Sequence, residues 1–175
     1  MQIIPGSDEA IRLLNTSGSQ VIVVSNQSGV AKGYYEELDI GLFNDEIKQQ
    51  LSLKGAHIDA LYYCPHHPDA IIEKYKSECR CRKPNPGMII NAAKEHDVDL
   101  RKSYVIGDKW SDIEAGKNAG CQPILVLTGH GTDELSKIKD PECPVAADLY
   151  EAVNTYILEK SNPRDNNNIR SYGRH

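Results

Sequence analysis

The sequence predicts an α/β fold in which helices cover both faces of a parallel sheet. Short apolar runs rich in branched residues alternate along the chain with amphipathic helical segments, a pattern typical of parallel sheets. The clearest run, residues 21–24, contains no polar residue, as expected for a strand buried on both faces. At 175 residues, 39% hydrophobic and 26% charged, the chain has the length and composition of one ordinary globular domain.

The expected elements follow in a regular order. A helix is expected over residues 8–15, with Ser7 as its cap. The other expected strands lie at 21–24, 58–63, 104–106 and 123–127, and the other expected helices at 35–53, 87–95, 111–119 and 149–159. We expect residues 1–160 to form one domain. The tail from residue 161 lacks apolar residues and is expected to be disordered.

Charge and cysteine content narrow the class of protein. The net charge of -5 argues against a nucleic-acid partner. No apolar run approaches the ~20 residues that span a bilayer, and no signal peptide pattern is visible, so we expect no membrane partner and a cytoplasmic protein. In a reducing compartment, closely spaced cysteines are metal ligands more often than disulfides.

Two close pairs of soft ligands predict a zinc site. Cys64 and His66 form the first pair, and Cys79 and Cys81 form the second, with one short loop between the pairs. Four such ligands form the closed tetrahedral shell of a structural zinc, so a catalytic zinc is less favoured. His67 competes with His66 for the ligand position, although the C-x-H spacing favours His66. The alternative is a set of ordinary buried cysteines beside surface histidines.

Three further polar segments could hold a ligand, and two of them follow strands, where ligands of parallel sheets bind. Residues 25–29 offer hydroxyl, amide and backbone donors for a phosphate oxygen, but a plain turn has similar residues. Arg82 and Lys83 beside two prolines make a cationic corner, or else a solvated basic turn. Asp108 follows a strand and can hold Mg²⁺, or else it caps the next helix.

Taken together and in this order, the segments resemble the haloacid-dehalogenase-like (HAD-like) phosphatases. The strings S-N-Q-S-G, Y-Y-C-P-H-H-P, C-R-C-R-K-P-N-P-G-M and G-D-K-W-S-D look like one subgroup, that of D-glycero-D-manno-heptose 1,7-bisphosphate phosphatase and histidinol-phosphatase. The resemblance covers about residues 3–149. It implies a three-layer α/β/α fold with a parallel sheet, a zinc-stabilised loop and no large cap domain.

The resemblance also implies a reaction and its residues. It implies hydrolysis of a sugar bisphosphate, most specifically at the 7-phosphate of the heptose, through an Mg²⁺-assisted aspartyl-phosphate. Ser25 and Lys83 would bind the phosphoryl oxygens as catalytic groups, and Asp108 would hold Mg²⁺. The remaining substrate contacts would be Asn26, Gln27, Ser28, Arg82 and Lys109. The alternatives are a histidinol-phosphatase and a catalytically dead phosphosugar-binding module, and the acidic balance disfavours a zinc-finger-like nucleic-acid binder. We expect a monomer.

The sequence departs from the resemblance at one motif. Members of the family begin with an apolar strand that ends in D-x-D-G-T, whose first Asp attacks phosphorus and whose second is the acid/base. Asp8 stands in a helix start, and Asp97 and Asp99 are followed by Leu-Arg, so neither matches. The resemblance makes the missing strand the central one of the sheet. We therefore expect a truncated sequence or a late start codon rather than an evolved pseudoenzyme, and no phosphatase activity from these residues alone.

Overall fold

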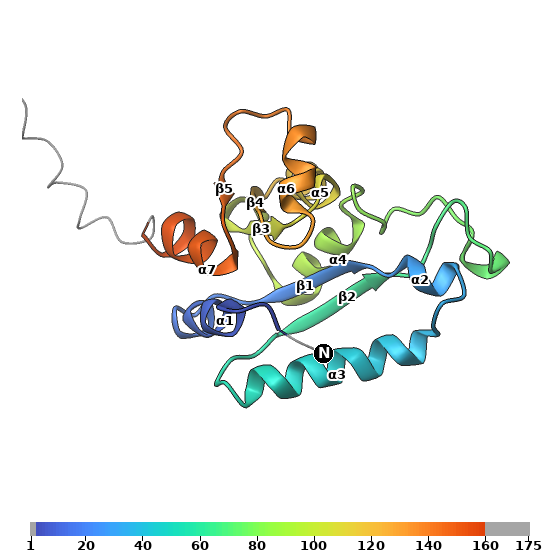
Figure 1. The fold of residues 1–175 in the computed structure, drawn as a ribbon, viewed down its shortest axis with the longest axis horizontal. Coiled ribbons are helices and arrows are strands. Elements are labelled where there is room, and N and C mark those ends of the chain that lie inside the picture. Colours follow the sequence, from blue (N-terminus) through green and yellow to red (C-terminus); the bar gives the residue numbers. More distant parts are fainter. Residues whose placement is uncertain (1–2, 160–175) are drawn as a thin grey trace, which may run out of the picture.

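The computed structural model describes residues 3–159, and every strand pair in that range is parallel (Figure 1). The principal elements are α1 (Ser7–Thr16), β1 (Ile22–Asn26), α2 (Ser28–Ala31), α3 (Glu37–Ser52), β2 (Ala60–Cys64), α4 (Gly87–His96), β3 (Tyr104–Gly107), α5 (Trp110–Ala119), β4 (Gln122–Val126), α6 (Gly131–Glu134), β5 (Val145–Ala146) and α7 (Leu149–Glu151). A π-helical segment, Ala152–Leu158, continues α7, and single 3₁₀ turns lie at Glu73–Tyr75, Leu100–Lys102 and Leu135–Lys137.

The predicted alternation of helices and strands is confirmed, with element ends within two residues of those expected. Gly6, not Ser7, is the N-cap of α1, because its positive φ of 81° turns the chain into the helix without a side-chain cap. The elements that were not predicted are the short ones: α2, α6 and β5. The predicted tail from residue 161 lies outside the described residues. Within residues 3–159, no helix combines the length and apolarity that crossing a membrane requires.

The N-terminal half is built on β1 and β2, which are paired in parallel with Val24 opposite Tyr62. Helix α3 runs along one face of this pair, and α4 contacts the other (Figure 1). On the α3 side, Leu51 is buried against Val21 and Ile58. This half therefore has the helix–sheet–helix layering that the sequence predicts.

The C-terminal half repeats the layering around the order β3-β4-β5. Alternate residues of β4 point to opposite faces. Ile124 packs with Ala152 of the π-helical segment, whereas Leu125 packs with Ile113 of α5. These four side chains are wholly buried, so β4 forms the centre of the core of this half.

The strands divide between two sheets, where the sequence suggested one. β1 pairs only with β2 and β3 only with β4 among the described strands, so each has one free edge. Residues of β1 and β3 are half-buried, which corrects the expectation that residues 21–24 are covered on both faces. Val24 and Val105 nevertheless pack against one shared cluster that includes Ile89 and Ala115. The two sheets thus meet through the helices α4 and α5 and not through strand pairing.

The free edges carry backbone groups without a ladder partner in residues 3–159. Val21 O accepts a hydrogen bond from Asp59 N, directly before β2, at 2.8 Å, and Gln27 N donates one to Cys64 O at 2.8 Å. The backbone groups of odd-numbered residues along β1 therefore face β2. Backbone groups alternate in direction along a strand, so Ile22 and Val24 face away from β2. By the same alternation, Tyr104 and Ile106 face away from β4, because Ser103 bonds to Gln122.

Candidate functional site

Lys83 lies where the two sheets approach each other. Its Nζ donates to the backbone oxygen of Val24 at 2.7 Å and pairs with Asp112 Oδ1 at 2.6 Å. The Val24 oxygen belongs to the free edge of β1, and Asp112 belongs to α5, which packs on β3. The two charged side chains are only 11% and 10% exposed, so water screens their attraction little. Lys83 therefore connects the carboxyl end of β1 to the helix that follows β3.

Asn26, at the end of β1, fixes the backbone of the same lysine. Its Nδ2 donates to Lys83 O at 3.1 Å, and Lys83 N donates to its Oδ1 at 3.0 Å. Asn118 of α5 donates to the next carbonyl, that of Pro84, at 3.1 Å, and the Lys83–Pro84 peptide bond is cis. Both ends of the Asn26 amide are thereby occupied, which leaves one amide N–H for a ligand.

Ser25 is the neighbouring residue of β1, and its hydroxyl is bonded to a glutamine. Gln27 Nε2 donates to Ser25 Oγ at 3.1 Å, and the hydroxyl of Tyr35 donates to Gln27 Oε1 at 2.6 Å. Ser28 follows as the first residue of α2. Lys83 binds the backbone of Val24, the residue before Ser25. The predicted serine and lysine therefore meet at the carboxyl end of β1.

Asp108 follows β3 and faces a second loop. Its Oδ2 accepts a hydrogen bond from the backbone of His130 at 2.9 Å. Gly129 lies so close that a Cβ there would stand 2.3 Å from Asp108 Oδ2, so only glycine fits. The cap of α5 is made by Asp112, whose Oδ2 accepts from the backbone of Lys109 at 3.1 Å. The alternative reading of Asp108 as the helix cap is therefore not what the structure contains.

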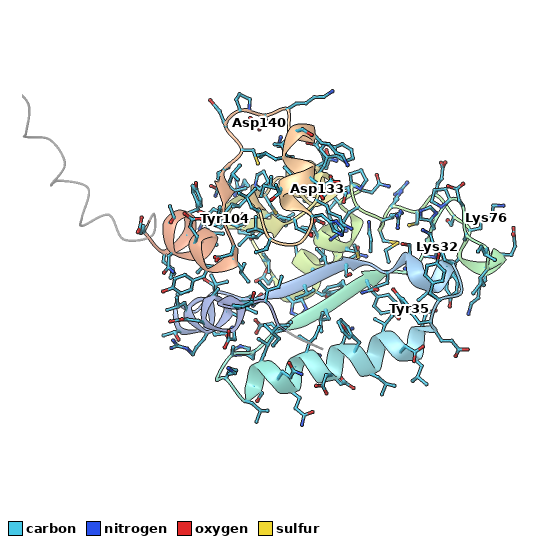
Figure 2. The ribbon with its side chains drawn as sticks, in the orientation of Figure 1. Lys32, Tyr35, Lys76, Tyr104, Asp133 and Asp140 are labelled. Carbon is cyan, nitrogen blue, oxygen red and sulfur yellow. The ribbon has the colours of Figure 1, made fainter. Side chains whose placement is uncertain are left out.

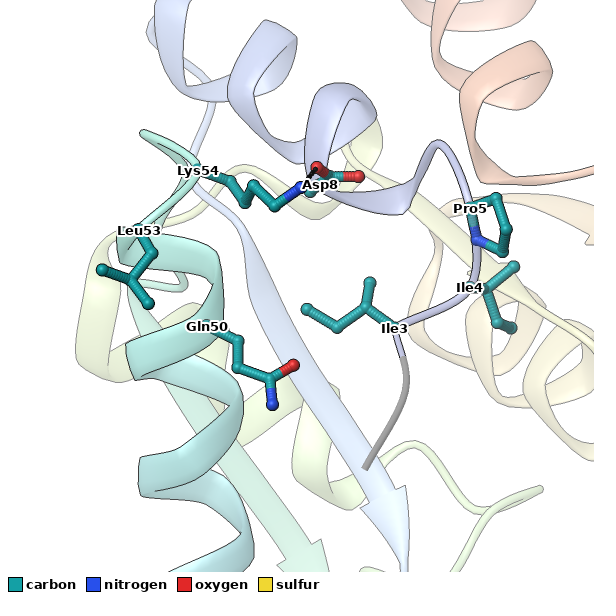
Figure 3. A pocket seen from close by; sticks show the side chains of 7 residues that line it. All are labelled: Ile3, Ile4, Pro5, Asp8, Gln50, Leu53 and Lys54. Atoms are coloured by element: carbon teal, nitrogen blue, oxygen red, sulfur yellow. Dashed lines mark ion pairs between the residues drawn. The ribbon is translucent and has the colours of Figure 1, made fainter.

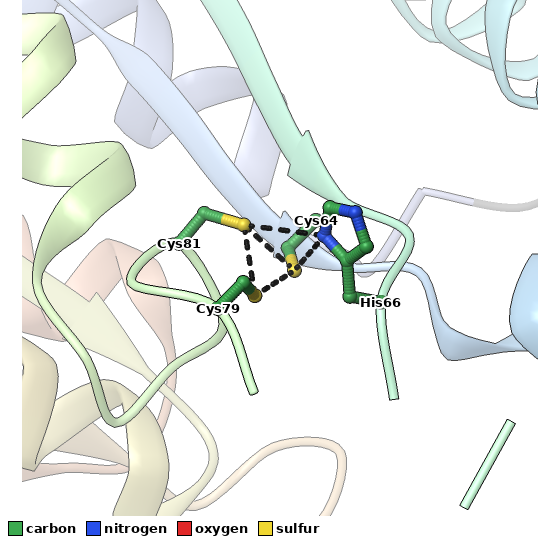
Figure 4. A group of neighbouring side chains, drawn as sticks. All are labelled: Cys64, His66, Cys79 and Cys81. Atoms are coloured by element: carbon green, nitrogen blue, oxygen red, sulfur yellow. Dashed lines mark hydrogen bonds between the residues drawn. The ribbon is translucent and has the colours of Figure 1, made fainter. Parts of the chain in front are cut away.

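The two predicted ligand pairs converge on one cluster (Figure 4). Cys81 Sγ lies 3.0 Å from Cys64 Sγ and 3.1 Å from Cys79 Sγ, and the third sulfur pair is 3.4 Å apart. His66 Nδ1 lies 3.7 Å and 3.6 Å from the sulfurs of Cys64 and Cys81. His67 Nδ1 instead accepts a bond from the backbone of Asp69 at 3.0 Å. Of the two histidines, His66 is the one in the cluster.

The donor set fits a tetrahedral zinc. Zinc–sulfur bonds of about 2.3 Å put the sulfurs of such a shell about 3.7 Å apart, so the three sulfurs, at 3.0, 3.1 and 3.4 Å, would move slightly apart around the ion. Burial, followed by hydrogen bonds to the other two thiols, raises the pKa of Cys64. Burial also opposes ionisation of Cys79, but hydrogen bonds from Cys81 and Cys64 outweigh it and hold the Cys79 pKa at about 7. Thiolate character, which zinc requires of its ligands, is thus already favoured at Cys79.

The cluster shapes the basic corner next to it. Arg82 follows Cys81 directly, and its guanidinium donates to the backbone oxygen of His66 at 3.2 Å. Gly87 closes the corner: a Cβ there would lie 2.2 Å from the carbonyl oxygen of Arg80, so a larger residue does not fit. Arg82 and Lys83 are consequently held by contacts on both sides of the corner.

A separate pocket of about 430 Å³ lies near the end of α3 (Figure 3). It is lined by Ile3, Ile4, Pro5, Asp8, Gln50, Leu53 and Lys54. Leu53 and Lys54 precede β2, so the pocket lies toward the amino ends of the strands. Ligands of parallel α/β sheets bind at the opposite, carboxyl ends. None of the predicted site residues lines this pocket, and we do not assign the site to it.

Sequence reasoning missed several contributors to the site. Asp112 is the last residue of the string G-D-K-W-S-D, but its ion pair to Lys83 was not expected. Tyr35 and His130 were not singled out. Their partners are distant in sequence or depend on loop geometry, and no local pattern marks them. Among residues 3–159, moreover, Asp108 belongs to no group of three or more possible metal ligands; only the cysteine–histidine cluster forms such a group.

Comparison of the sequence with known proteins gives consistent matches. The HAD-hydrolase-like family model matches residues 80–152. D-glycero-alpha-D-manno-heptose-1,7-bisphosphate 7-phosphatase of Photorhabdus laumondii is 42% identical over 125 residues, which are 71% of this chain and 68% of the relative. D-glycero-D-manno-heptose-1,7-bisphosphate 7-phosphatase of Chlorobaculum tepidum is 36% identical over 170 residues, covering 93% and 85%.

Solved structures with the same fold include two heptose bisphosphate phosphatases. D,D-heptose 1,7-bisphosphate phosphatase from B. bronchiseptica, complexed with magnesium and phosphate, superposes with a TM-score of 0.80 at 36% identity, covering 89% of this chain and 84% of that one. The enzyme from Burkholderia thailandensis gives a TM-score of 0.66 at 29% identity, covering 86% and 83%.

Proposed function

The chain belongs to the HAD-like phosphatases, in the family of the heptose 1,7-bisphosphate 7-phosphatases, and we propose that it carries the phosphate-binding part of a sugar-bisphosphate phosphatase. The proposed substrate is D-glycero-D-manno-heptose 1,7-bisphosphate, cleaved at the 7-phosphate, as the names of the relatives suggest. The observation that carries the proposal is the convergence of Ser25 and Lys83 at the carboxyl end of β1.

The proposed roles follow from the chemistry of the side chains. Ser25 donates a hydrogen bond from its hydroxyl group to a phosphoryl oxygen. Lys83 brings a positive charge that neutralises the charge growing on the phosphoryl group in the transition state. Asp112 holds the ammonium group in place through the 2.6 Å ion pair, and Asn26 holds its backbone. Gln27, Ser28, Arg82 and Lys109 are the proposed contacts to the rest of the substrate.

Two metals belong to the proposal. Asp108 is the proposed protein ligand of Mg²⁺, which when bound neutralises phosphoryl charge. One Asp108 oxygen is committed to His130, so the other is the one available for a cation. Cys64, His66, Cys79 and Cys81 are proposed to hold a structural Zn²⁺, which fixes the loop that presents Arg82 and Lys83.

Hydrolysis further requires a nucleophile at phosphorus and an acid for the leaving oxygen. The family resemblance assigns both to D-x-D-G-T, a string that residues 1–175 do not contain. The contacts of Ser25 and Lys83 include one carboxylate, Asp112, and the ion pair occupies it. Turnover is therefore proposed for the enzyme with that motif in place, and ligand binding for residues 1–175.

The remaining proposals concern the setting. The cytoplasm suits the five cysteines, all of them free thiols in the structure, because a reducing compartment keeps thiols available for a metal. A monomer without nucleic-acid or membrane partners is proposed alongside.

The test is calorimetric titration of residues 1–175 with heptose 1,7-bisphosphate and with histidinol phosphate, Mg²⁺ being in excess. Heptose bisphosphate should bind more tightly, and Lys83→Ala should weaken it by about tenfold or more. Tighter binding of histidinol phosphate would favour that rival substrate. Absence of binding to either compound, in a protein that melts cooperatively, would refute the proposed site.

A further inference from the structure

Tyr35 is connected to Ser25 through a single amide group. It lies in the connection between α2 and α3 (Figure 2) and donates its hydroxyl proton to Gln27 Oε1 at 2.6 Å. Gln27 Nε2 in turn donates to Ser25 Oγ at 3.1 Å. All three side chains are half-buried, so bulk water competes with these bonds less than at an open surface.

The ring of Tyr35 is held tightly in this position. It packs against the buried cluster that contains Val30 and Ile40. On its other side lies Gly29, where a Cβ would stand 2.2 Å from the ring. Tyr34 N donates to Gly29 O at 2.9 Å and turns the chain back toward Gln27. The tyrosine hydroxyl is therefore fixed by packing and does not depend on its own hydrogen bond for its place.

The backbone of Gln27 is equally fixed. Its N–H donates to Cys64 O at 2.8 Å, and its carbonyl accepts from Val30 N at 3.2 Å. Only the side-chain torsions of Gln27 are left to vary. An amide group set between two hydroxyl groups can adopt two orientations, related by a half-turn that exchanges its oxygen and nitrogen.

These two orientations have opposite consequences for Ser25. With the amide nitrogen toward Ser25, the serine oxygen accepts, and its single proton points elsewhere. With the amide oxygen toward Ser25, that oxygen takes the proton and leaves a lone pair facing outward. A phosphoryl oxygen only accepts hydrogen bonds, so Ser25 binds it well in the first orientation and poorly in the second.

A phenol hydroxyl is a stronger donor and a weaker acceptor than an aliphatic hydroxyl, so Tyr35 favours the orientation in which it donates to the amide oxygen. From this geometry we propose that Tyr35 is a positioning residue: by donating to Gln27 Oε1 it holds the amide so that Ser25 keeps its proton for the phosphoryl group. The inference rests on the proposed function of Ser25 and deepens it. Tyr35 itself does not touch the substrate. Its effect on phosphate binding must therefore pass through Ser25, and this dependence is what an experiment can isolate.

The test is a double-mutant cycle read by calorimetric titration with inorganic phosphate, Mg²⁺ being in excess. Tyr35→Phe keeps the ring and removes the donor, and it should weaken phosphate binding about threefold to tenfold, the loss of one hydrogen bond. Tyr34→Phe is the matched control, because Tyr34 is adjacent and 75% exposed, and it should change nothing. In a Ser25→Ala background, Tyr35→Phe should have no further effect.

A second measurement separates failure of the inference from failure of the proposed function. The side-chain amide resonances of Gln27 in NMR spectra should shift in Tyr35→Phe and stay in place in Tyr34→Phe, whether or not phosphate binds. Unshifted resonances would overturn the inference, as would an equal loss of phosphate affinity in both serine backgrounds. Shifted resonances in a protein that binds no phosphate would keep the Tyr35–Gln27–Ser25 contact and refute the proposed function.

Discussion

Lys83 is the residue that most directly relates the structure to the proposed chemistry, because its ammonium group contacts both β1 and α5. Its ion pair with Asp112 is buried, and removing one partner of a buried pair typically lowers the stability of the fold by several kcal/mol. The guanidinium of Arg82, its neighbour, donates instead to His66 O in the cysteine–histidine loop. Two adjacent basic residues are thus expected to have different roles, which substitution can distinguish.

We predict that Lys83→Ala, in a form of the enzyme with phosphatase activity, lowers kcat by on the order of 100-fold, since the charge it neutralises grows in the transition state. Arg82→Ala should act mainly on KM, because it would grip the non-reacting part of the substrate. Steady-state kinetics on heptose 1,7-bisphosphate measures both. Circular dichroism melting of each variant controls for unfolding. Small and equal effects would identify the corner as a solvated turn.

At the scale of single residues, the candidate site residues could be named from the sequence, but the contacts between them could not. Ser25 lies near the end of β1, Asp108 directly follows β3, and Lys83 lies shortly before α4; these short motifs are readable from the sequence. The Lys83–Asp112 ion pair is not, because it depends on how α5 packs against the loop. The same holds for Tyr35, whose contact with Gln27 depends on the absence of a side chain at Gly29.

Among the larger elements, the cysteine–histidine loop is the one that we propose to be held by a metal. We predict one zinc per chain by native mass spectrometry, and none in the double variant Cys79→Ser with Cys81→Ser, since two of four ligands are lost. Cys143→Ser, a buried thiol outside the cluster, serves as control and should keep its zinc. Retention of zinc by the double variant would refute the assigned ligand set.

Glu37 connects the first turn of α3 to the same loop. Tyr75 donates to its Oε1 at 2.6 Å and Tyr63 to its Oε2 at 2.8 Å. These two hydrogen bonds, that from Tyr75 first, lower the pKa of Glu37 below its usual value. A lowered folded pKa stabilises the fold above the unfolded pKa of about 4.3, and this contribution is lost as the pH falls through the folded value.

We therefore predict that Glu37→Gln melts a few degrees below the wild type at pH 6, and that the difference shrinks toward pH 3. The effect is small because the carboxylate is exposed. Asp45→Asn, an exposed carboxylate on the same helix, should show no such convergence. Thermal melts of the three proteins across this range provide the measurement. A difference that stays constant with pH would show that the Glu37 carboxylate is not bound as described.

At the scale of helices and strands, the longer elements were the ones predictable from the sequence. Periodic segments such as α3, and apolar runs such as those of β1 and β4, were readable because many residues repeat one pattern. β5 has two residues, and two residues carry no period. The π-helical end of the last helix was likewise not predictable, because its bonding pattern depends on packing against β3 and β4.

Residues 3–159 form two parallel sheets with facing helices, and β1 and β3 each have one free edge. Resemblance to the HAD-like phosphatases implied a central strand that this sequence does not match. The division between the two sheets lies between β1 and β3. The parallel order of the remaining strands was predictable, because each strand pair is joined by a helix-containing connection. The division into two sheets was not, since strand pairing is a long-range property.

We predict that a polypeptide of residues 1–175 releases no phosphate from heptose 1,7-bisphosphate even with excess Mg²⁺. Fusing an apolar strand that ends in D-x-D-G-T to its N-terminus should give Mg²⁺-dependent release and raise the melting temperature by several degrees. The strand would pair the outward backbone groups of Ile22, Tyr104 and Ile106, and unpaired groups of this kind cost free energy. A fused D-x-D-G-T with both Asp replaced by Asn should keep the stability and lose the release. Robust turnover by residues 1–175 alone would place the nucleophile elsewhere, with Asp8 and Asp97 the first carboxylates to substitute.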